Sequence, residues 1–212
     1  FNETLRIMPD YALGFEHEAP PAGYDLYKSG ARFFNNIRLD KKGIVGSGRI
    51  DYLSSTSNSD AYTFYQDSVL ASGHYFRIRR DNIGGVTYPE ILVENYRMKW
   101  LPKSDEMYVR NTKDPFRLYE SASLEGTTVL SKTGVRAAGK FLAEGFEARS
   151  RDFSFEESKM SANRAKFFVL SDNPKKPLMQ GNDIRLDFDF NSEIGQIAPE
   201  IAGMAALEFP YA

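Results

Sequence analysis

Apolar and polar residues alternate with a period of two along much of the chain, the pattern of β-strands with one buried face. In residues 183–190, for example, Ile184, Leu186 and Phe188 alternate with charged residues. Helical periodicity is scarce, and the Ala-rich residues 201–206 are too few to form a stable helix alone. Turn signals interrupt the pattern at short intervals, at residues 40–43, 81–85, 132–134 and 172–174. Many short strands separated by such turns predict an all-β fold.

An internal repeat organises the chain. An offset of 91 residues aligns residues 39–82 with residues 130–173 without a gap, and ten of the 44 aligned positions are identical. The identities include turn glycines, turn Asp-Asn pairs and strand aromatics, the residue types on which β architecture depends. Weaker similarities at the flanks place the unit starts near Leu5, Met98 and Leu186. We therefore expect a first unit at residues 1–97, a second at 98–185 and the start of a third at 186–212.

The first unit illustrates the expected strands. They cover residues 31–39, 44–53, 62–65 and 69–79. The polar residues 54–59 predict a loop. Gly46 and Gly48 indicate a bulge or a close backbone approach, because glycine weakens a strand interior. In the last strand the alternation slips around Gly73, a natural place for a one-residue bulge.

Two architectures accommodate these units. The first is an elongated stack of antiparallel strands, an open jellyroll or solenoid-like arrangement, with a core that continues from unit to unit. The alternative is a pair of tandem β-sandwiches, since about 90 residues is close to an immunoglobulin-like module. Independent cores and a flexible linker within residues 95–103 would favour the alternative.

Composition restricts the function classes. The 212 residues are 42% hydrophobic, enough for a sizeable core, and 27 basic against 29 acidic residues give a net charge of −2. This charge provides no electrostatic basis for binding nucleic acid. The absence of cysteine excludes disulfides, iron–sulfur clusters and thiolate zinc sites. No apolar run reaches the length of a transmembrane helix, and we expect no cofactor.

One set of oxygen donors resembles a cation site. Four polar residues recur at every second position and therefore face one side of the same strand: Asp187, Asp189, Asn191 and Glu193. Four such donors could bind Ca²⁺. A flat strand spaces them too widely to surround one ion, however, so the solvated face of a strand is the favoured interpretation, and we predict no metal ligand.

Charged and aromatic clusters also have a functional and a structural interpretation. The basic residues 77–80 could contact an anion or a polysaccharide, but protection of an edge strand by charges is the favoured interpretation. The many aromatic residues could form a sugar-stacking platform. Most of them occupy alternating positions, and Trp100 aligns with Phe188, as Phe64 aligns with Phe155. Core packing is therefore expected for these residues.

No catalytic motif is present in the sequence. The two histidines, His17 and His74, lack a nucleophile motif such as G-x-S-x-G, and there is no phosphate-binding glycine loop or H-E-x-x-H motif. The 29 acidic residues do not define the fixed separation that a glycosidase pair requires. We predict a non-enzymatic protein, with no catalytic, cofactor-binding or metal-binding residues.

Three segments carry a family resemblance. Residues 43–53, 62–68 and 122–134 resemble recurring stretches of very long, uncharacterised β-rich envelope proteins of Gram-negative gut bacteria. Residues 135–139 depart from that pattern, because Ala137 replaces a glycine. The resemblance implies an extracytoplasmic β-repeat protein, periplasmic or at the cell surface, and implies no catalytic residues.

These observations predict a non-catalytic structural or binding segment of a larger cell-envelope protein. The chain starts without methionine and ends in residues typical of ordered protein, so we expect a piece of a longer or processed chain. The expected partner is a protein, glycan or lipid of the envelope. Two alternatives stay open: a carbohydrate-binding or carbohydrate-active domain, which would show a groove with exposed aromatics and paired carboxylates, and a lipid carrier, which would show a long apolar groove.

Overall fold

The computed structural model describes a chain built from β-strands. The described residues are 4–7, 13–16, 30–34, 36–41, 43–119, 122–143, 145–170, 177–190 and 200–201, and they contain strands, turns and bends but no helix. The strands are β1 Thr4–Ile7, β2 Leu13–Glu16, β3 Ala31–Phe34, β4 Asn36–Asp40, β5 Gly43–Tyr52, β6 Ser55–Phe64, β7 Val69–Ile78, β8 Asp81–Ile83, β9 Val86–Tyr88, β10 Ile91–Leu101, β11 Glu106–Asn111, β12 Phe116–Leu118, β13 Ala122–Ser131, β14 Gly134–Ala143, β15 Phe146–Glu156, β16 Lys159–Leu170, β17 Pro177–Asp189 and β18 Glu200–Ile201.

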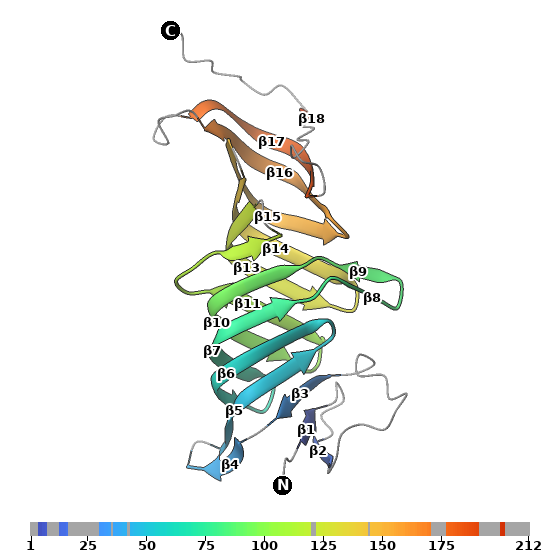
Figure 1. Cartoon of the computed structure of the whole chain (residues 1–212), viewed down its shortest axis with the longest axis vertical. Helices are drawn as coiled ribbons and strands as arrows, with labels where there is room; N and C mark the ends of the chain where they lie inside the picture. Colours follow the sequence, from blue (N-terminus) through green and yellow to red (C-terminus); the bar gives the residue numbers. More distant parts are fainter. Residues whose placement is uncertain are drawn as a thin grey trace.

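Sixteen of these strands form one antiparallel sheet, and β8 and β9 form a separate hairpin. The order along the sheet is β18-β17-β16-β15-β14-β13-β11-β10-β7-β6-β5-β3-β1-β2, with β12 paired to β10 and β13, and β4 paired to β5. The strands are stacked along the long axis of the molecule (Figure 1). The prediction of an all-β stack of antiparallel strands is confirmed. The tandem-sandwich alternative is wrong, because residues 95–103 belong to β10 and its turn, and a single core continues through them.

The offset of 91 residues relates two strands of equal length, β5 and β14. β5 and β14 each have ten residues and start at Gly43 and Gly134. The pairing irregularity between Gly46 and Gly48 in β5 recurs between Ala137 and Gly139 in β14, also 91 residues later. The expected unit boundaries at 97/98 and 185/186 fall inside β10 and β17, so strands of the continuous sheet cross both of them. The division into units stays a prediction.

A crease runs across the middle of the long strands. In β6, β7, β10 and β16, the alternation of buried and exposed residues is interrupted by two consecutive residues that are not buried. The buried residues on either side are therefore three positions apart instead of two: Ser59 and Tyr62, Gly73 and Phe76, Val93 and Tyr96, and Ala162 and Ala165. The slip expected around Gly73 is thereby confirmed. The extra residue at the crease keeps the same face of each strand buried on both sides of the bend.

Glycines form the crease in β5, β13 and β14. Gly48, Gly126 and Gly139 have φ values of 123°, 153° and 146°, in the region that disfavours other residues. Gly126 and Gly139 are directly paired, and a Cβ on Gly139 would lie 2.0 Å from the carbonyl oxygen of Glu125. At Gly46 a Cβ would lie 2.2 Å from the ring of Tyr62, so the close neighbour there is a side chain rather than the expected backbone.

The crease folds the sheet lengthwise, so that its two halves face each other across an apolar interior. One continuous inner row crosses nine strands in register: Phe64, Val69, Trp100, Met107, Leu130, Val135, Phe155, Met160 and Phe188. Rings from opposite halves are in contact, with centroids 6.3 Å apart for Tyr52 and Trp100 and 5.7 Å apart for Phe146 and Phe188. Side chains of the two halves therefore meet inside the fold.

Two expected elements of the first unit differ from the structure. Residues 31–39 form two strands, β3 and β4, rather than one. The loop expected at residues 54–59 is wrong, because β6 starts at Ser55 and its inward residues Ser55, Ser57 and Ser59 are buried. Their hydroxyls bond to main-chain carbonyls, including Tyr52 O at 2.6 Å for Ser55. Position on the inner face, rather than side-chain hydrophobicity, decides their burial.

Candidate functional site

The folded sheet has two long margins that meet at a seam. The margins are the two long sides of the sheet, where its strands end. Along the first margin lie the strand ends at Tyr52, Ile78, Ile91, Leu118 and Phe146. Along the second margin lie the turns β6–β7, β10–β11, β13–β14 and β15–β16. Three tyrosine hydroxyls at the first margin donate to main-chain carbonyls in turns of the second. Tyr52 donates to Asp105, Tyr88 to Ser131 at 2.6 Å, and Tyr119 to Glu157 at 2.5 Å.

The three bonds join different pairs of elements. Tyr52 ends β5 and reaches the β10–β11 turn, Tyr88 ends β9 and reaches the β13–β14 hairpin, and Tyr119 follows β12 and reaches the β15–β16 turn. The ring of Tyr119 also stacks on Phe190 at 4.8 Å. The seam thus closes the folded sheet with hydrogen bonds to backbone rather than with a second layer.

Burial changes the acidity of the seam tyrosines. Burial, with a smaller contribution from the Asp105 carboxylate, raises the pKa of Tyr88 to about 12 from the usual 10.0. Burial and the same carboxylate also raise the pKa of Tyr52, and burial raises that of Tyr119. The hydroxyls are therefore protonated donors at neutral pH, as their bonds to carbonyl oxygens require.

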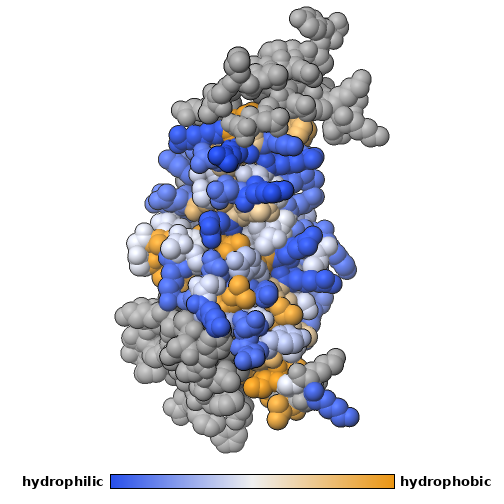
Figure 2. Space-filling view, turned by 180° about the vertical axis from the view of Figure 1, so that it is seen from behind, coloured by the Kyte–Doolittle hydropathy of each residue, from blue (hydrophilic) through white to orange (hydrophobic). Residues whose placement is uncertain are grey.

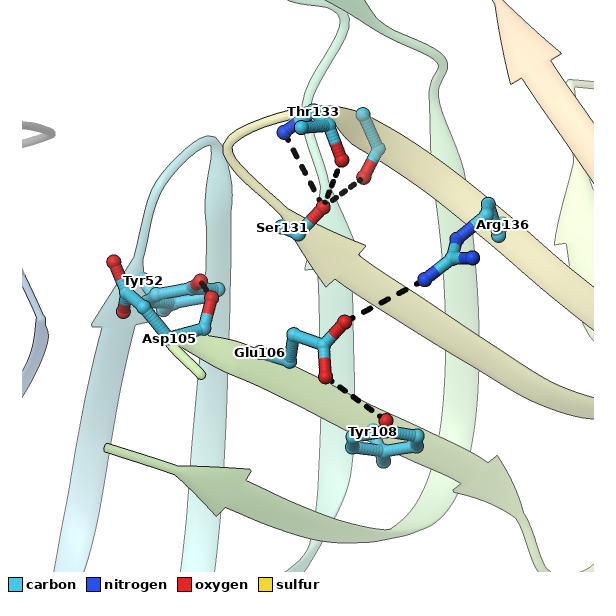
Figure 3. Close-up of polar contacts among 8 residues, drawn as sticks. Tyr52, Asp105, Glu106, Tyr108, Ser131, Thr133 and Arg136 are labelled. Atoms are coloured by element: carbon cyan, nitrogen blue, oxygen red, sulfur yellow. Dashed lines mark hydrogen bonds and ion pairs between the residues drawn. The ribbon is translucent and has the colours of Figure 1, made fainter. Parts of the chain in front are cut away.

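Polar contacts of the second margin surround the first of these bonds (Figure 3). Asp105 is buried beneath Tyr52, and Lys132 Nζ lies 3.0 Å from its Oδ2. Glu106, next to it, accepts a hydrogen bond from Tyr108 at 3.0 Å and pairs with Arg136 at 3.5 Å. These contacts join the β10–β11 turn to the β13–β14 hairpin, and so they support the seam.

A pocket of about 730 Å³ lies beside the β8–β9 hairpin, where it approaches β14 and β15. Four side chains that line it form a cross-strand row on the outer face of β14 to β17: Arg136, Ser154, Ser161 and Asp187. The two serine hydroxyls are 2.8 Å apart. Phe155 also lines the pocket but is 4% exposed, so it offers no stacking surface for a sugar.

The histidine prediction can be examined only at His74, because His17 lies outside the described residues. His74 is exposed at the crease, with Nε2 3.2 Å from Asp60 and Nδ1 3.1 Å from Asn95. The Asn95 side chain in turn donates to Asp114 at 3.3 Å. These contacts tie β6, β7 and β10 together on the outer surface and include no serine, threonine or lysine that could act as a nucleophile.

The expected oxygen-donor strand lies only partly within the described residues. Asp187 pairs with Arg185 at 3.3 Å, and Asp189 accepts a hydrogen bond from Ser158 at 3.2 Å. Asn191 and Glu193 are not described. Within the described part of the chain, no group of three or more His, Cys, Asp or Glu side chains could hold a metal ion.

Residues 77–80 do not belong to an edge strand. β7 lies between β6 and β10, so the expectation of a charge-protected edge is wrong. Arg77 pairs with Glu90 at 2.5 Å across the outer surface, and the Glu90 carboxylate raises the pKa of Arg77. This arginine therefore already has an ionic partner within the fold.

The predicted core aromatics are at the inner face. Trp100 is fully buried, Phe188 and Phe155 are each 4% exposed, and Phe64 is partly buried against the same core. Tyr65 is 55% exposed, unlike Tyr62, which lies inside. The sequence could not separate these two tyrosines.

Comparison with known proteins gives no match, whether with protein-family models, curated proteins or solved structures. No helix in the described residues has the length and hydrophobicity needed to cross a membrane. Function must therefore be argued from the chain's own residues. Sequence analysis missed the tyrosine seam, because Tyr52, Tyr88 and Tyr119 do not recur at the repeat offset and their acceptors are main-chain atoms.

Proposed function

We propose that the chain is a non-catalytic structural or binding segment of a larger extracytoplasmic β-repeat protein of a bacterial envelope. One observation supports this most directly: a single sheet folds on itself, fills its interior with its own side chains and ties its margins with the tyrosine seam. Such a segment extends lengthwise by adding strands and needs no second domain for its core.

The outer surface supports the same proposal. Its charged residues form cross-strand ion pairs, such as Arg117 with Glu94 at 2.5 Å and Lys140 with Glu125 at 2.9 Å. Exposed pairs of this kind contribute little stability, but they keep the surface of an extended sheet polar.

The test uses antibodies raised against the purified chain. In fractionated cells of the producing organism, they should detect an envelope protein larger than the 24.0 kDa of this chain. A cytoplasmic location, or a protein of only this mass, would contradict the proposal. Intact and permeabilised cells, compared with a known cytoplasmic marker, separate surface exposure from periplasmic location.

Carriage of a lipid is a second candidate, favoured by the unbroken apolar inner row from Phe64 to Phe188. A bound acyl chain would have to displace aromatic side chains between the two halves. Native mass spectrometry of the purified chain should then show a bound phospholipid, and opening the seam with Tyr88→Phe should increase its amount. A protein without adducts in both forms would exclude this candidate.

A further inference from the structure

Three basic side chains stand directly opposite one another on the outer face of β14, β15 and β16. Lys140 pairs in register with Arg149, and Arg149 with Lys166. Arg151 and Arg164 are exposed at the crease beside them. We call these five residues the basic ladder. The upper part of the surface in Figure 2, toward the C-terminal strands, is mostly hydrophilic.

The basic ladder is only partly neutralised. Lys140 pairs with Glu125 at 2.9 Å, and Arg149 pairs with Glu147 while its guanidinium lies 5.2 Å from the ring centre of Phe168. The other three basic residues make no ion pair with any described residue: Arg151, Arg164 and Lys166. Among the residues whose side chains are described, these three cations therefore have no ionic partner.

The strands that the 91-residue offset aligns with β14–β16 carry few of these charges. The corresponding in-register residues of β5, β6 and β7, each 91 positions earlier, are Arg49, Asn58 and Tyr75. At the crease, Asp60 and Gly73 correspond to Arg151 and Arg164.

Two features of the ladder act against stability. Like charges directly opposite in a sheet are destabilising. Arg164 also has a φ of 59°, a conformation unfavourable for arginine. A contribution to folding therefore does not explain Arg151, Arg164 and Lys166, which make no ion pair within the described residues.

We propose that the basic ladder binds an acidic polysaccharide, with the polymer lying across β14, β15 and β16. Neighbouring strands are about 4.8 Å apart, so the ladder offers one cation at roughly the length of each sugar ring along the polymer. The proposal names a ligand class for the binding role proposed above. It rests on that role only for the location in the envelope, because the argument for an acidic ligand uses the charges of the ladder alone.

A polymer suits the ladder better than a membrane surface. The large apolar side chains that the described residues expose belong to β4, β6–β7 and their connections, not to β14–β16. The ladder therefore lacks the apolar anchors that interfacial membrane binding uses.

The test measures binding of the full chain to polygalacturonate, with neutral dextran as the control polymer. Binding should be specific for polygalacturonate and should weaken roughly tenfold between about 50 mM and about 200 mM salt, since a few cation–anion contacts are involved. Absence of binding at low salt, or equal binding of dextran, would overturn the proposal.

Matched variants locate the site. Arg151→Gln, Arg164→Gln and Lys166→Gln together should weaken binding at least tenfold. Arg97→Gln, Lys99→Gln and Arg110→Gln remove the same charge from exposed positions on β10 and β11 and should leave binding within about twofold. Equal losses in both variants would show that only net charge matters and would overturn the proposal.

Basic residues introduced at the corresponding positions of β5–β7 test whether the ladder is sufficient for binding. Asn58→Arg, Asp60→Arg and Tyr75→Lys should give the β5–β7 face a second binding site and raise the number of chains bound per length of polymer. Binding to vesicles of phosphatidylcholine and phosphatidylglycerol without binding to polygalacturonate would overturn the polysaccharide proposal in favour of a lipid headgroup. Neither result depends on the fractionation experiment, so the two proposals can fail separately.

Discussion

The strands β5–β7 and β14–β16, which the 91-residue offset aligns, share several backbone features but carry different side chains. Both groups contain three long antiparallel strands, turn at a glycine with positive φ (Gly43 or Gly134), and shift register at the crease. Their inner faces remain buried throughout most of their length. Their outer faces share almost no charge pattern, as the basic ladder shows. The difference separates what the fold requires from what it leaves free.

Inside, the fold requires volume rather than residue identity. At the first margin, Tyr52 pairs with Ser55 in β5–β6, whereas Ala143 pairs with Phe146 at the corresponding place in β14–β15. In the first pair the large residue lies on the earlier strand, and in the second pair it lies on the later strand. The space between the two halves of the sheet is therefore filled in both cases. Volume compensation explains why the serine-rich segment is a core strand.

The first prediction tests the shared core. Phe155→Ala should cost about 3–5 kcal/mol, the range for a buried phenylalanine. Phe64→Ala should cost about half as much, because Phe64 is only partly buried. Denaturant unfolding should show one transition for each variant, since one core links both regions. Two separate transitions would contradict a continuous core, and near-neutral effects at both sites would contradict the 91-residue alignment.

The second prediction concerns the crease. Gly139→Ala places a Cβ 2.0 Å from the Glu125 carbonyl at a φ of 146°, so backbone strain alone should cost about 1–3 kcal/mol and the clash should add to it. Gly145→Ala is the control, because its φ is also positive, at 80°, but no atom lies within 4 Å of the added Cβ. Thermal unfolding should rank Gly139→Ala as clearly worse. Equal effects would mean that close strand approach is not what the crease glycine provides.

The third prediction concerns the seam, whose first two hydroxyls belong to Tyr52 in β5 and Tyr88 in β9. Tyr88→Phe removes a buried hydrogen bond and should cost about 1 kcal/mol at pH 7. Folding raises the pKa of Tyr88 from 10.0 to about 12, so its stabilising effect is complete below pH 10 and is lost as the pH rises toward 12. Unfolding followed between pH 8 and 12 should therefore be less pH-dependent in the variant. If the stability of wild type and of Tyr88→Phe depended equally on pH in this range, the pKa of Tyr88 would not change on folding, and the prediction would be wrong.

The fourth and smallest prediction exchanges outer-face residues between the two regions. Lys166→Tyr relieves repulsion with Arg149 and should stabilise the chain by a few tenths of a kcal/mol, whereas Tyr75→Lys should have no benefit. Added salt should narrow the difference between wild type and Lys166→Tyr, because screening weakens the same repulsion. A clear loss of stability in Lys166→Tyr would instead give Lys166 a structural role.

The sequence predicted the strand content well because alternation records which face of each strand is buried. It also located Gly46, Gly48 and Gly73, since a glycine within a strand signals an irregularity. It failed at residues 54–59, where polarity concealed burial, and at residues 77–80, where charge suggested an edge that lies in the middle of the sheet. Both errors come from judging a residue without knowing its neighbours across the fold.

By itself, then, the sequence determined the antiparallel all-β class and the inward direction of Trp100, Phe155 and Phe188. These depend on local alternation and on turn chemistry, which neighbouring residues carry. Only the tertiary structure decided the lengthwise folding of the sheet, the tyrosine seam and the alignment of Lys140, Arg149 and Lys166. These depend on twist, register and main-chain acceptors far away in the chain, and no single residue type encodes them.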